Sequence, residues 1–92
     1  MVSIFYYRKG DDFVPGKSHI KVFSEKCEDD DFDLESYFET FNDSEENPLA
    51  TQEHQEFLQE HQLHTSMSTG DVVQYKNDYW QCGDFGWEKI EK

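Results

Sequence analysis

The stretch VVQYKNDYWQCGDFGWEKI, residues 72–90, decides the fold of this chain. It contains three short runs of β-branched and aromatic residues, which are typical of strands. These runs are Val72–Tyr75, Tyr79–Cys82 and Trp87–Ile90. Polar turn signals separate them, the first at 76–78, where Asn-Asp suits a hairpin, and the second at 84–86. The stretch therefore predicts an antiparallel β-meander with aromatic side chains on one face.

Two further strands are predicted near the N-terminus. Val2–Arg8 is rich in β-branched and aromatic residues, and His19–Ser24 follows after turn signals at 9–12 and 15–16. Strict alternation in the second run would place Ile20 and Val22 on one face, with Ser24, and would place His19, Lys21 and Phe23 on the other. Hairpin pairing of the two strands is expected, although the long connection does not require it.

An acidic amphipathic helix is predicted over residues 33–42. Asp33 is a suitable N-cap, and the carboxylates before it suit the positive end of a helix. The apolar residues then follow helical spacing and form one stripe: Leu34, Tyr37, Phe38 and Phe41. Asn42 is expected to end the helix because it tolerates the left-handed conformation.

Residues 43–65 are harder to interpret. A polar loop opens the segment, and a helical pattern from about Thr51 to Leu63 has little apolar content. This pattern is consistent with a solvated helix lying across the domain or with a partly ordered loop. The whole chain is predicted to be one α+β domain, with N-terminal strands in 1–26, the acidic helix in 33–42, the polar loop or second helix in 43–65 and the meander in 66–92.

The negative charge is concentrated in the middle of the chain. The net charge is −13, and residues 27–60 hold thirteen acidic residues with no Lys or Arg. Residues 1–26 carry a net charge of +2 and residues 61–92 a net charge of −2. A field concentrated on one side of a small protein influences which partners it attracts. The negative charge also disfavours direct binding of DNA or RNA, which requires a basic groove. Trp80 and Trp87 could stack on bases, but core packing is the role expected for them.

The cellular setting is expected to be the cytoplasm. The N-terminus MVSIFYYRKG lacks the apolar core of a signal peptide, and no run reaches the about 18 apolar residues of a membrane span. Cys27 and Cys82 are expected to be free thiols in a reducing compartment, and a disulfide in a secreted domain is the alternative.

The segment HTSMSTGDVV, residues 64–73, resembles a small module of plasmids, phages and integrative elements, as do YWQC at 79–82 and FGW at 85–87. The family pattern is Ser-Met-Ser-x-Gly-Asp-Val, a strand pair and a Gly-aromatic ending, with an acidic helix upstream. The resemblance implies a mobile-element setting and a cytoplasmic location, and it carries over no activity or site residues. From the residues themselves we expect structural roles: backbone geometry for Gly70, a local hydrogen bond for Asp71 and core packing for Val72.

Metal binding is not predicted. His54, His61 and His64 with Cys27 or Cys82 could form a zinc site, and on a helix His61 and His64 would share a face. Structural zinc sites, however, use paired ligands at short spacing, and exposed polar histidines are the favoured interpretation. Alternating acids from Asp29 resemble a calcium loop, but Leu34 stands where that loop needs Gly and Thr40 where it needs Glu.

No catalytic or cofactor motif is present in the sequence. It has no Gly-x-Ser-x-Gly nucleophile elbow and no complete phosphate loop of the form Gly-x-x-x-x-Gly-Lys-Ser/Thr, and we expect neither enzymatic activity nor a cofactor.

Two functions from different classes fit the sequence. The first is a protein-binding accessory. Its carboxylates would imitate a row of phosphates and bind the DNA-binding surface of a basic partner, such as a DNA-binding host protein. A solubilising role for the same charge is the alternative. The predicted partner-binding residues are Asp29, Asp30, Asp31, Glu35, Glu39, Asp43, Glu45 and Glu46. The second function is a structural accessory or homodimer subunit that uses the aromatic meander as its interface.

Overall fold

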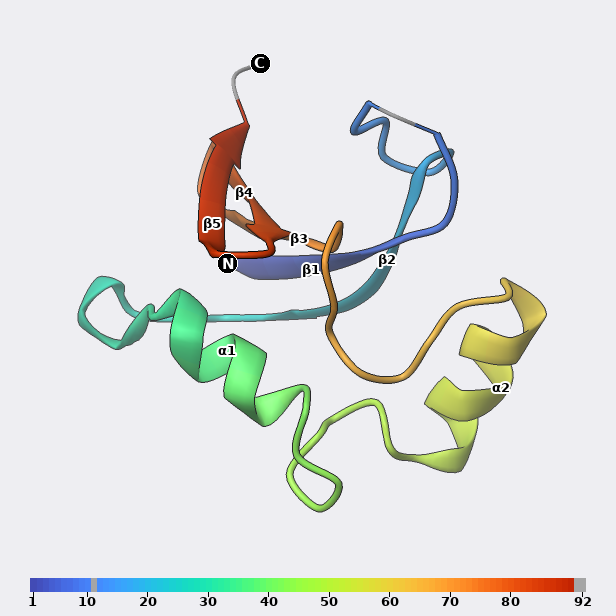
Figure 1. Cartoon of the computed structure of the whole chain (residues 1–92). Helices are drawn as coiled ribbons and strands as arrows, with labels where there is room; N and C mark the ends of the chain where they lie inside the picture. Colours follow the sequence, from blue (N-terminus) through green and yellow to red (C-terminus); the bar gives the residue numbers. More distant parts are fainter. Residues whose placement is uncertain (11, 91–92) are drawn as a thin grey trace.

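The computed structural model describes residues 1–10 and 12–90, in which a five-stranded antiparallel sheet carries two α-helices on one side (Figure 1). The elements in chain order are β1 (Val2–Tyr7), β2 (His19–Glu25), the 3-10 turn η1 (Asp29–Asp31), α1 (Leu34–Thr40), α2 (Gln52–Glu60), β3 (Val72–Tyr75), β4 (Asp78–Gly83) and β5 (Gly86–Ile90). The predicted α+β class and antiparallel sheet are confirmed. Asp11, in the first predicted turn, lies outside the described residues.

The N-terminal strand lies inside the sheet, whose strand order is β2-β1-β3-β4-β5. Five of the six residues of β1 are buried, with Val2, Ile4 and Tyr6 inaccessible to solvent. A strand that is apolar on both faces is stable only between two neighbours and under cover on both sides. Pairing of β1 with β3 therefore joins the N-terminal hairpin to the meander, with Val2 opposite Tyr75.

The alternation predicted for the second strand is wrong at Phe23. The register between β1 and β2 shifts between Ile4 and Phe5, so that Ile4 faces Phe23 and Phe5 faces Lys21. Such a β-bulge inserts one unpaired residue and changes which side chains face inward. As a result, Val22 and Phe23 both pack into the same core cluster.

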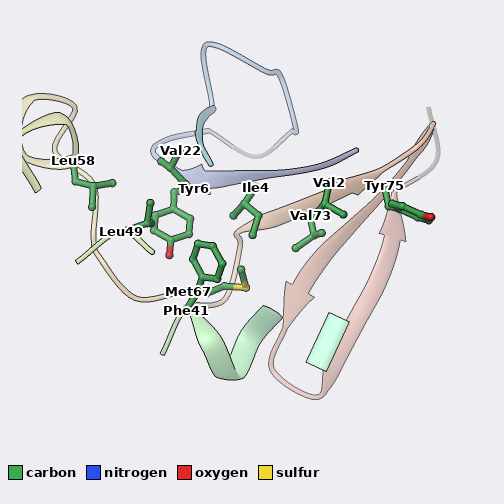
Figure 2. Close-up of a cluster of buried hydrophobic side chains, with 10 residues drawn as sticks. All are labelled: Val2, Ile4, Tyr6, Val22, Phe41, Leu49, Leu58, Met67, Val73 and Tyr75. Atoms are coloured by element: carbon green, nitrogen blue, oxygen red, sulfur yellow. The ribbon is translucent and has the colours of Figure 1, made fainter. Parts of the chain in front are cut away.

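The main core lies between the sheet and the segment that carries the helices. Figure 2 shows Phe41 and Met67 beside Tyr6, with Leu49 and Leu58 further along the same cluster. Trp80 and Trp87 are half-buried against this cluster. The cluster thus fixes the middle of the chain to one face of the sheet.

A smaller core covers the opposite face. Phe13, from the β1–β2 connection, packs edge-on against Phe5 with ring centroids 5.4 Å apart, and Val72 lies beneath them. The β1–β2 connection therefore supplies the cover for this face of the sheet.

The acidic helix is shorter than predicted, and its end has a different cause. It stops at Thr40 with Phe41 as the C-cap. Asn42 is not among the described non-glycine residues with positive φ, so the predicted left-handed stop is wrong. Its side-chain amide instead donates to the carbonyl of Phe38 at 2.8 Å and satisfies one of the free carbonyls of the last turn.

The helical pattern from about Thr51 to Leu63, which left a helix and a loop open, forms the helix α2. The side chain of Thr51 accepts a hydrogen bond from the backbone N–H of His54 and caps the first turn, while Leu58 is buried in the core. The helix ends at Glu60, before Leu63, and Gln62 follows in the left-handed conformation with φ of 57°. Leu58, together with the partly buried Phe57 and Leu63, therefore anchors this polar segment to the core.

The first turn of the meander also differs from the prediction. Asp78 is a strand residue paired with Tyr75, and the loop consists of Lys76 and Asn77, with Lys76 left-handed at φ 56°. The second turn is formed by Asp84 and Phe85, and Gly83 pairs with Gly86 across it. Both hairpins therefore have two-residue loops, and the positive φ of Lys76 in the first loop suits the twist of antiparallel strands.

Candidate functional site

The acidic middle of the chain forms an arm, residues 27–60, that follows one side of the sheet (Figure 1). Three buried side chains hold it there: Phe41 after α1, Leu49 in the connection and Leu58 in α2. Because these anchors are spread along the arm, the carboxylates between them keep fixed places relative to the sheet.

Asn47 fixes the connection between the two helices. Its side-chain amide donates to the carbonyls of Phe41 at 2.8 Å and Thr65 at 3.2 Å, and its oxygen accepts from the backbone N–H of Leu49 at 2.9 Å. Asn47 is buried, so each of these bonds satisfies a polar group that has left water. No sequence motif indicated this role, because a loop asparagine is ordinarily exposed.

The predicted partner-binding residues are spread along the arm and are not gathered into one cluster. Asp30 belongs to η1, Glu35 and Glu39 to α1, and Glu45 and Glu46 to the connection, and all five side chains are exposed. The side chain of Asp31 lies outside the described part of the structure. The arm therefore offers a broad charged surface.

Asp29 differs from the other predicted residues because it has partners within the chain. Its carboxylate accepts a hydrogen bond from the hydroxyl of Tyr75 and pairs with the ammonium of Lys76 at 3.1 Å. Asp29 thereby joins η1 to the end of β3, and its negative charge is offset locally.

Asp43 organises the turn after α1. Its carboxylate accepts from the backbone N–H groups of Glu45 at 2.7 Å and Glu46 at 3.1 Å. These bonds favour the charged form and lower the pKa of Asp43 below its ordinary value. The turn is therefore built around a carboxylate that stays ionised.

The motif at residues 64–73 builds a buried polar centre around Asp71. One oxygen of the carboxylate accepts from the backbone N–H of Tyr7 at 2.7 Å. The other accepts from the backbone N–H of Ser68 and from Nε2 of His64, both at 2.7 Å. The carboxylate itself is fully buried. The structural role predicted for Asp71 is confirmed, and it extends beyond the local turn to β1.

His64, Ser68 and Asp71 do not have the geometry of a hydrolase triad. A triad places serine and carboxylate on different ring nitrogens, so that one nitrogen can take the serine proton. Here Nε2 of His64 donates to Asp71, and the hydroxyl of Ser68 lies 3.3 Å from that same nitrogen. A nitrogen that already carries a proton cannot act as a base for Ser68.

The helical position expected for His64 is wrong, although 37% of its side chain is exposed as expected. His64 follows the end of α2, and its ring stacks on Tyr6 with centroids 4.5 Å apart. Burial, with a further contribution from the charge of Asp71, raises the pKa of Tyr6 above its ordinary value. Its hydroxyl therefore stays protonated and donates to the carbonyl of Thr65 at 2.8 Å.

The other two histidines of the possible metal set also have roles within the chain. His61 is the C-cap of α2, and its ring lies 4.4 Å from that of Phe57. Nδ1 of His54 lies 2.7 Å from the hydroxyl of Thr51. Because α2 ends at Glu60, the prediction that His61 and His64 share a helical face is wrong. Across the described ranges 1–10 and 12–90, no group of three or more His, Cys, Asp or Glu side chains could hold a metal ion.

His19 is a buried residue that the sequence did not single out. Its Nε2 donates to the carbonyl of Gly70 at 2.7 Å, and its Nδ1 lies 2.8 Å from the hydroxyl of Ser18. Burial lowers its pKa, although the Gly70 hydrogen bond and the charge of Asp71 oppose this shift. The contact fixes the start of β2 to the turn before β3. Strict alternation placed His19 on the same face as Lys21, so the pattern gave no signal of its burial.

A pocket of about 400 Å³ lies between the end of β2 and α1. Inside it the hydroxyl of Tyr37 donates to a carboxylate oxygen of Glu25 at 2.8 Å, and Cys27 and Lys26 also line the walls. Burial is the main cause that raises the pKa of Tyr37, and the bond to Glu25 adds to it. Cys27 and Cys82 are both free thiols in this structure.

No described helix is long and apolar enough to cross a membrane.

Comparison with known proteins gives one informative relationship. The chain is 35% identical over 100 residues to the uncharacterised protein R785 of Acanthamoeba polyphaga mimivirus, and the match covers 97% of this chain and 91% of that protein. No protein-family model matches the chain, and no solved structure matches it.

Proposed function

The chain belongs to the same family as the mimivirus protein R785, and on that premise we propose that it is a protein-binding accessory of a virus or another mobile element. Its function is to present the acidic arm to a basic partner. The viral relative and the resemblance of residues 64–73 to a module of plasmids and phages support this setting. The cytoplasm is the compartment in which such a partner would be met.

The observation that carries the proposal is the exposure of the arm. Every acidic side chain described between residues 27 and 60 is exposed. Among these described side chains the one ion pair joins Asp29 to Lys76. Unpaired like charges on one side repel each other and reduce stability, so their concentration needs a reason beyond folding. A basic partner relieves that repulsion and is also attracted over a distance at low salt.

The partner we favour is a DNA-binding protein. A surface that binds duplex DNA offers Lys and Arg side chains placed to meet phosphates. Carboxylates held on α1, the connection and α2 can meet those same side chains. The chain would then compete with DNA and would not itself bind nucleic acid, because the arm repels phosphates.

The proposal assigns no catalytic activity and no cofactor to the chain. The arrangement of His64, Ser68 and Asp71 supports this, since Nε2 of His64 donates to Asp71 and cannot accept the proton of Ser68. The residues that resemble a reactive cluster instead have structural hydrogen-bonding roles.

A pull-down from host lysate tests the proposal when it is followed by a displacement assay. We expect a basic DNA-binding protein to be retained at low salt and released at about 0.5 M salt, where charge interactions are screened. Adding the chain to the recovered protein on labelled duplex DNA should release the DNA. Retention without any displacement of DNA would contradict the proposed competition.

A pair of double variants provides a control matched in charge. Glu39→Gln with Glu46→Gln removes two charges from the arm, and Asp12→Asn with Glu88→Gln removes two exposed charges elsewhere. We expect the arm variant to weaken partner binding and to reduce its salt dependence more than the control does. Equal effects would mean that total charge, and not the arm, determines binding.

A second candidate function is a homodimer subunit that uses the meander. It is favoured by Phe85, which is fully exposed at the tip of the β4–β5 hairpin, and by the half-buried Trp80 and Trp87. Light scattering distinguishes the two candidates. A dimer that Phe85→Ser converts to a monomer would support the interface, and a monomeric wild-type protein would exclude it.

A further inference from the structure

A small groove separates α1 from the turn between β4 and β5. Its cavity volume is about 170 Å³. Glu35 and Phe38 line it from α1, Asp84 lines it from the turn, and Cys82 and Trp87 line it from β4 and β5. The groove therefore joins one end of the acidic arm to the meander.

The walls of the groove combine aromatic rings with carboxylates. Phe38 and Trp87 are half-buried, so part of each ring remains accessible, whereas Glu35 and Asp84 are exposed. Asp84 is oriented by the hydroxyl of Thr69, which donates to it at 3.4 Å. No Lys or Arg is among the described residues that line this groove.

The electrostatic effect of both carboxylates reaches the thiol of Cys82. Burial is the main cause that raises the pKa of Cys82, and the charges of Asp71, Glu35 and Asp84 raise it further. A negatively charged thiolate is therefore disfavoured at this position. Burial disfavours any charge, but the contribution of the three carboxylates has the sign that attracts a positive group to the groove.

We propose that this groove binds the side chain of an arginine on the basic partner. The inference rests on the proposed function and names one contact of that surface. A guanidinium group stacks on aromatic faces, most favourably on tryptophan, and its planar donors bind carboxylates with two hydrogen bonds. The groove supplies both features, with Trp87 and Phe38 as walls and Glu35 and Asp84 at the rim.

Arginine suits the groove better than lysine does. The groove is shallow and small, so the group that enters must interact through a flat surface and through its edges. A lysine ammonium is a compact, strongly hydrated charge that loses more water on entry and has no planar surface to stack. Citrulline has nearly the shape of arginine without the charge, and it lacks the attraction to Glu35 and Asp84.

Nuclear magnetic resonance titration of the intact chain tests the groove directly. The probes are N-acetyl-arginine N-methylamide and its citrulline and lysine counterparts. We expect arginine to shift the indole N–H signal of Trp87 and the amide signals of Asp84, with citrulline about tenfold weaker and lysine in between. Equal shifts from arginine and citrulline, or no saturable shifts at these positions, would overturn the proposal.

Substitutions of the two groove carboxylates show whether these side chains contribute to arginine binding. Glu35→Gln and Asp84→Asn should each weaken arginine binding about threefold or more, as expected for loss of a partly exposed ion pair. Glu39→Gln is the matched control, because Glu39 lies on the same helix and is exposed but does not line the groove. The control should bind arginine as the wild-type chain does, and spectra of all three variants report whether the fold is retained.

The results separate this inference from the proposed function. If Glu35→Gln and Glu39→Gln weaken binding equally, arginine is attracted by the diffuse charge of the arm and the groove is not a site. The broader proposal would then still be decided by the displacement of DNA from a captured partner. If the groove binds arginine but no partner is captured, the contact exists and the proposed function fails.

Discussion

The carboxylate of Asp71 accepts a hydrogen bond from the backbone N–H of Tyr7 at 2.7 Å, across 64 positions of sequence. Tyr7 is the last residue of β1, and Asp71 directly precedes β3. The bond therefore continues the pairing of these neighbouring strands beyond the last backbone pair, Phe5 with Val72. His64 and Ser68 share the same carboxylate, so one buried side chain joins β1, the meander and the segment after α2.

Replacing Asp71 with Asn should destabilise the protein strongly. An amide retains one acceptor oxygen but presents N–H groups to at least one of the donors at Tyr7, Ser68 and His64. Loss of a buried charged acceptor with its donors left in place costs about 2–4 kcal/mol. Urea unfolding of D71N would measure the loss. The control is D78N, since Asp78 pairs with Lys89 at the surface and its removal should change stability by about 0–1 kcal/mol. Similar losses in both variants would contradict a special role for Asp71.

Among the polar residues of the connection between the helices, Asn47 should contribute most to the free energy of unfolding. Asn47→Ala removes two donated bonds and one accepted bond, and it leaves the carbonyl of Phe41 and the N–H of Leu49 without their side-chain partner. We expect a loss of about 2–3 kcal/mol in the free energy of unfolding. Asn42→Ala is the control, because Asn42 is exposed and its amide makes one bond, to Phe38. A loss in the control as large as in Asn47→Ala would show that the buried network is unimportant.

The strands and the first helix were predictable because each depends on local pattern. Alternation and aromatic content located β1 and the meander, and helical spacing from Leu34 to Phe41 located α1. Phe23 was assigned to the wrong face because a β-bulge arises from pairing between strands and not from the residues of one strand. The end of α1 was misattributed because Asn42 acts through its side chain and not through its backbone conformation.

The polar centre was only partly predictable. A hydrogen-bonding role for Asp71 follows from a Gly-Asp pair before a strand, but its partners Tyr7 and His64 lie in segments that only the fold brings together. Asn47 and His19 carried no signal of burial for the same reason. The distribution of charge along the sequence identified residues 27–60 as the acidic segment, whereas the groove beside Trp87 forms only where α1 meets the β4–β5 hairpin.

Leu58 should control whether α2 is ordered. It is the buried residue of this helix, with 1% of its surface exposed, and a polar nine-residue helix has little stability without tertiary contacts. Leu58→Ala should lower the free energy of unfolding by about 2–5 kcal/mol, and hydrogen exchange should accelerate first in residues 52–60. The control is Gln59→Ala, which alters an exposed neighbour in the same helix. Unchanged protection of α2 in Leu58→Ala would mean that Thr51 and the connection hold the helix without this anchor.

Stability should fall as the pH falls below about 6.5, and His19 should account for part of this loss. Burial lowers the pKa of His19 in the folded state below its ordinary value of 6.5, while the unfolded chain keeps that value. The unfolded state therefore binds a proton more readily, so the contribution of neutral His19 is complete above about pH 6.5 and is lost as the pH falls from there toward the lowered folded-state pKa. Urea unfolding of the wild-type chain and His19→Gln, compared at about pH 7.5 and about pH 5.5, isolates this term because the other titrating groups are common to both. The wild-type protein should lose more stability on acidification than the variant does. Equal losses would show that His19 titrates alike in the folded and unfolded states.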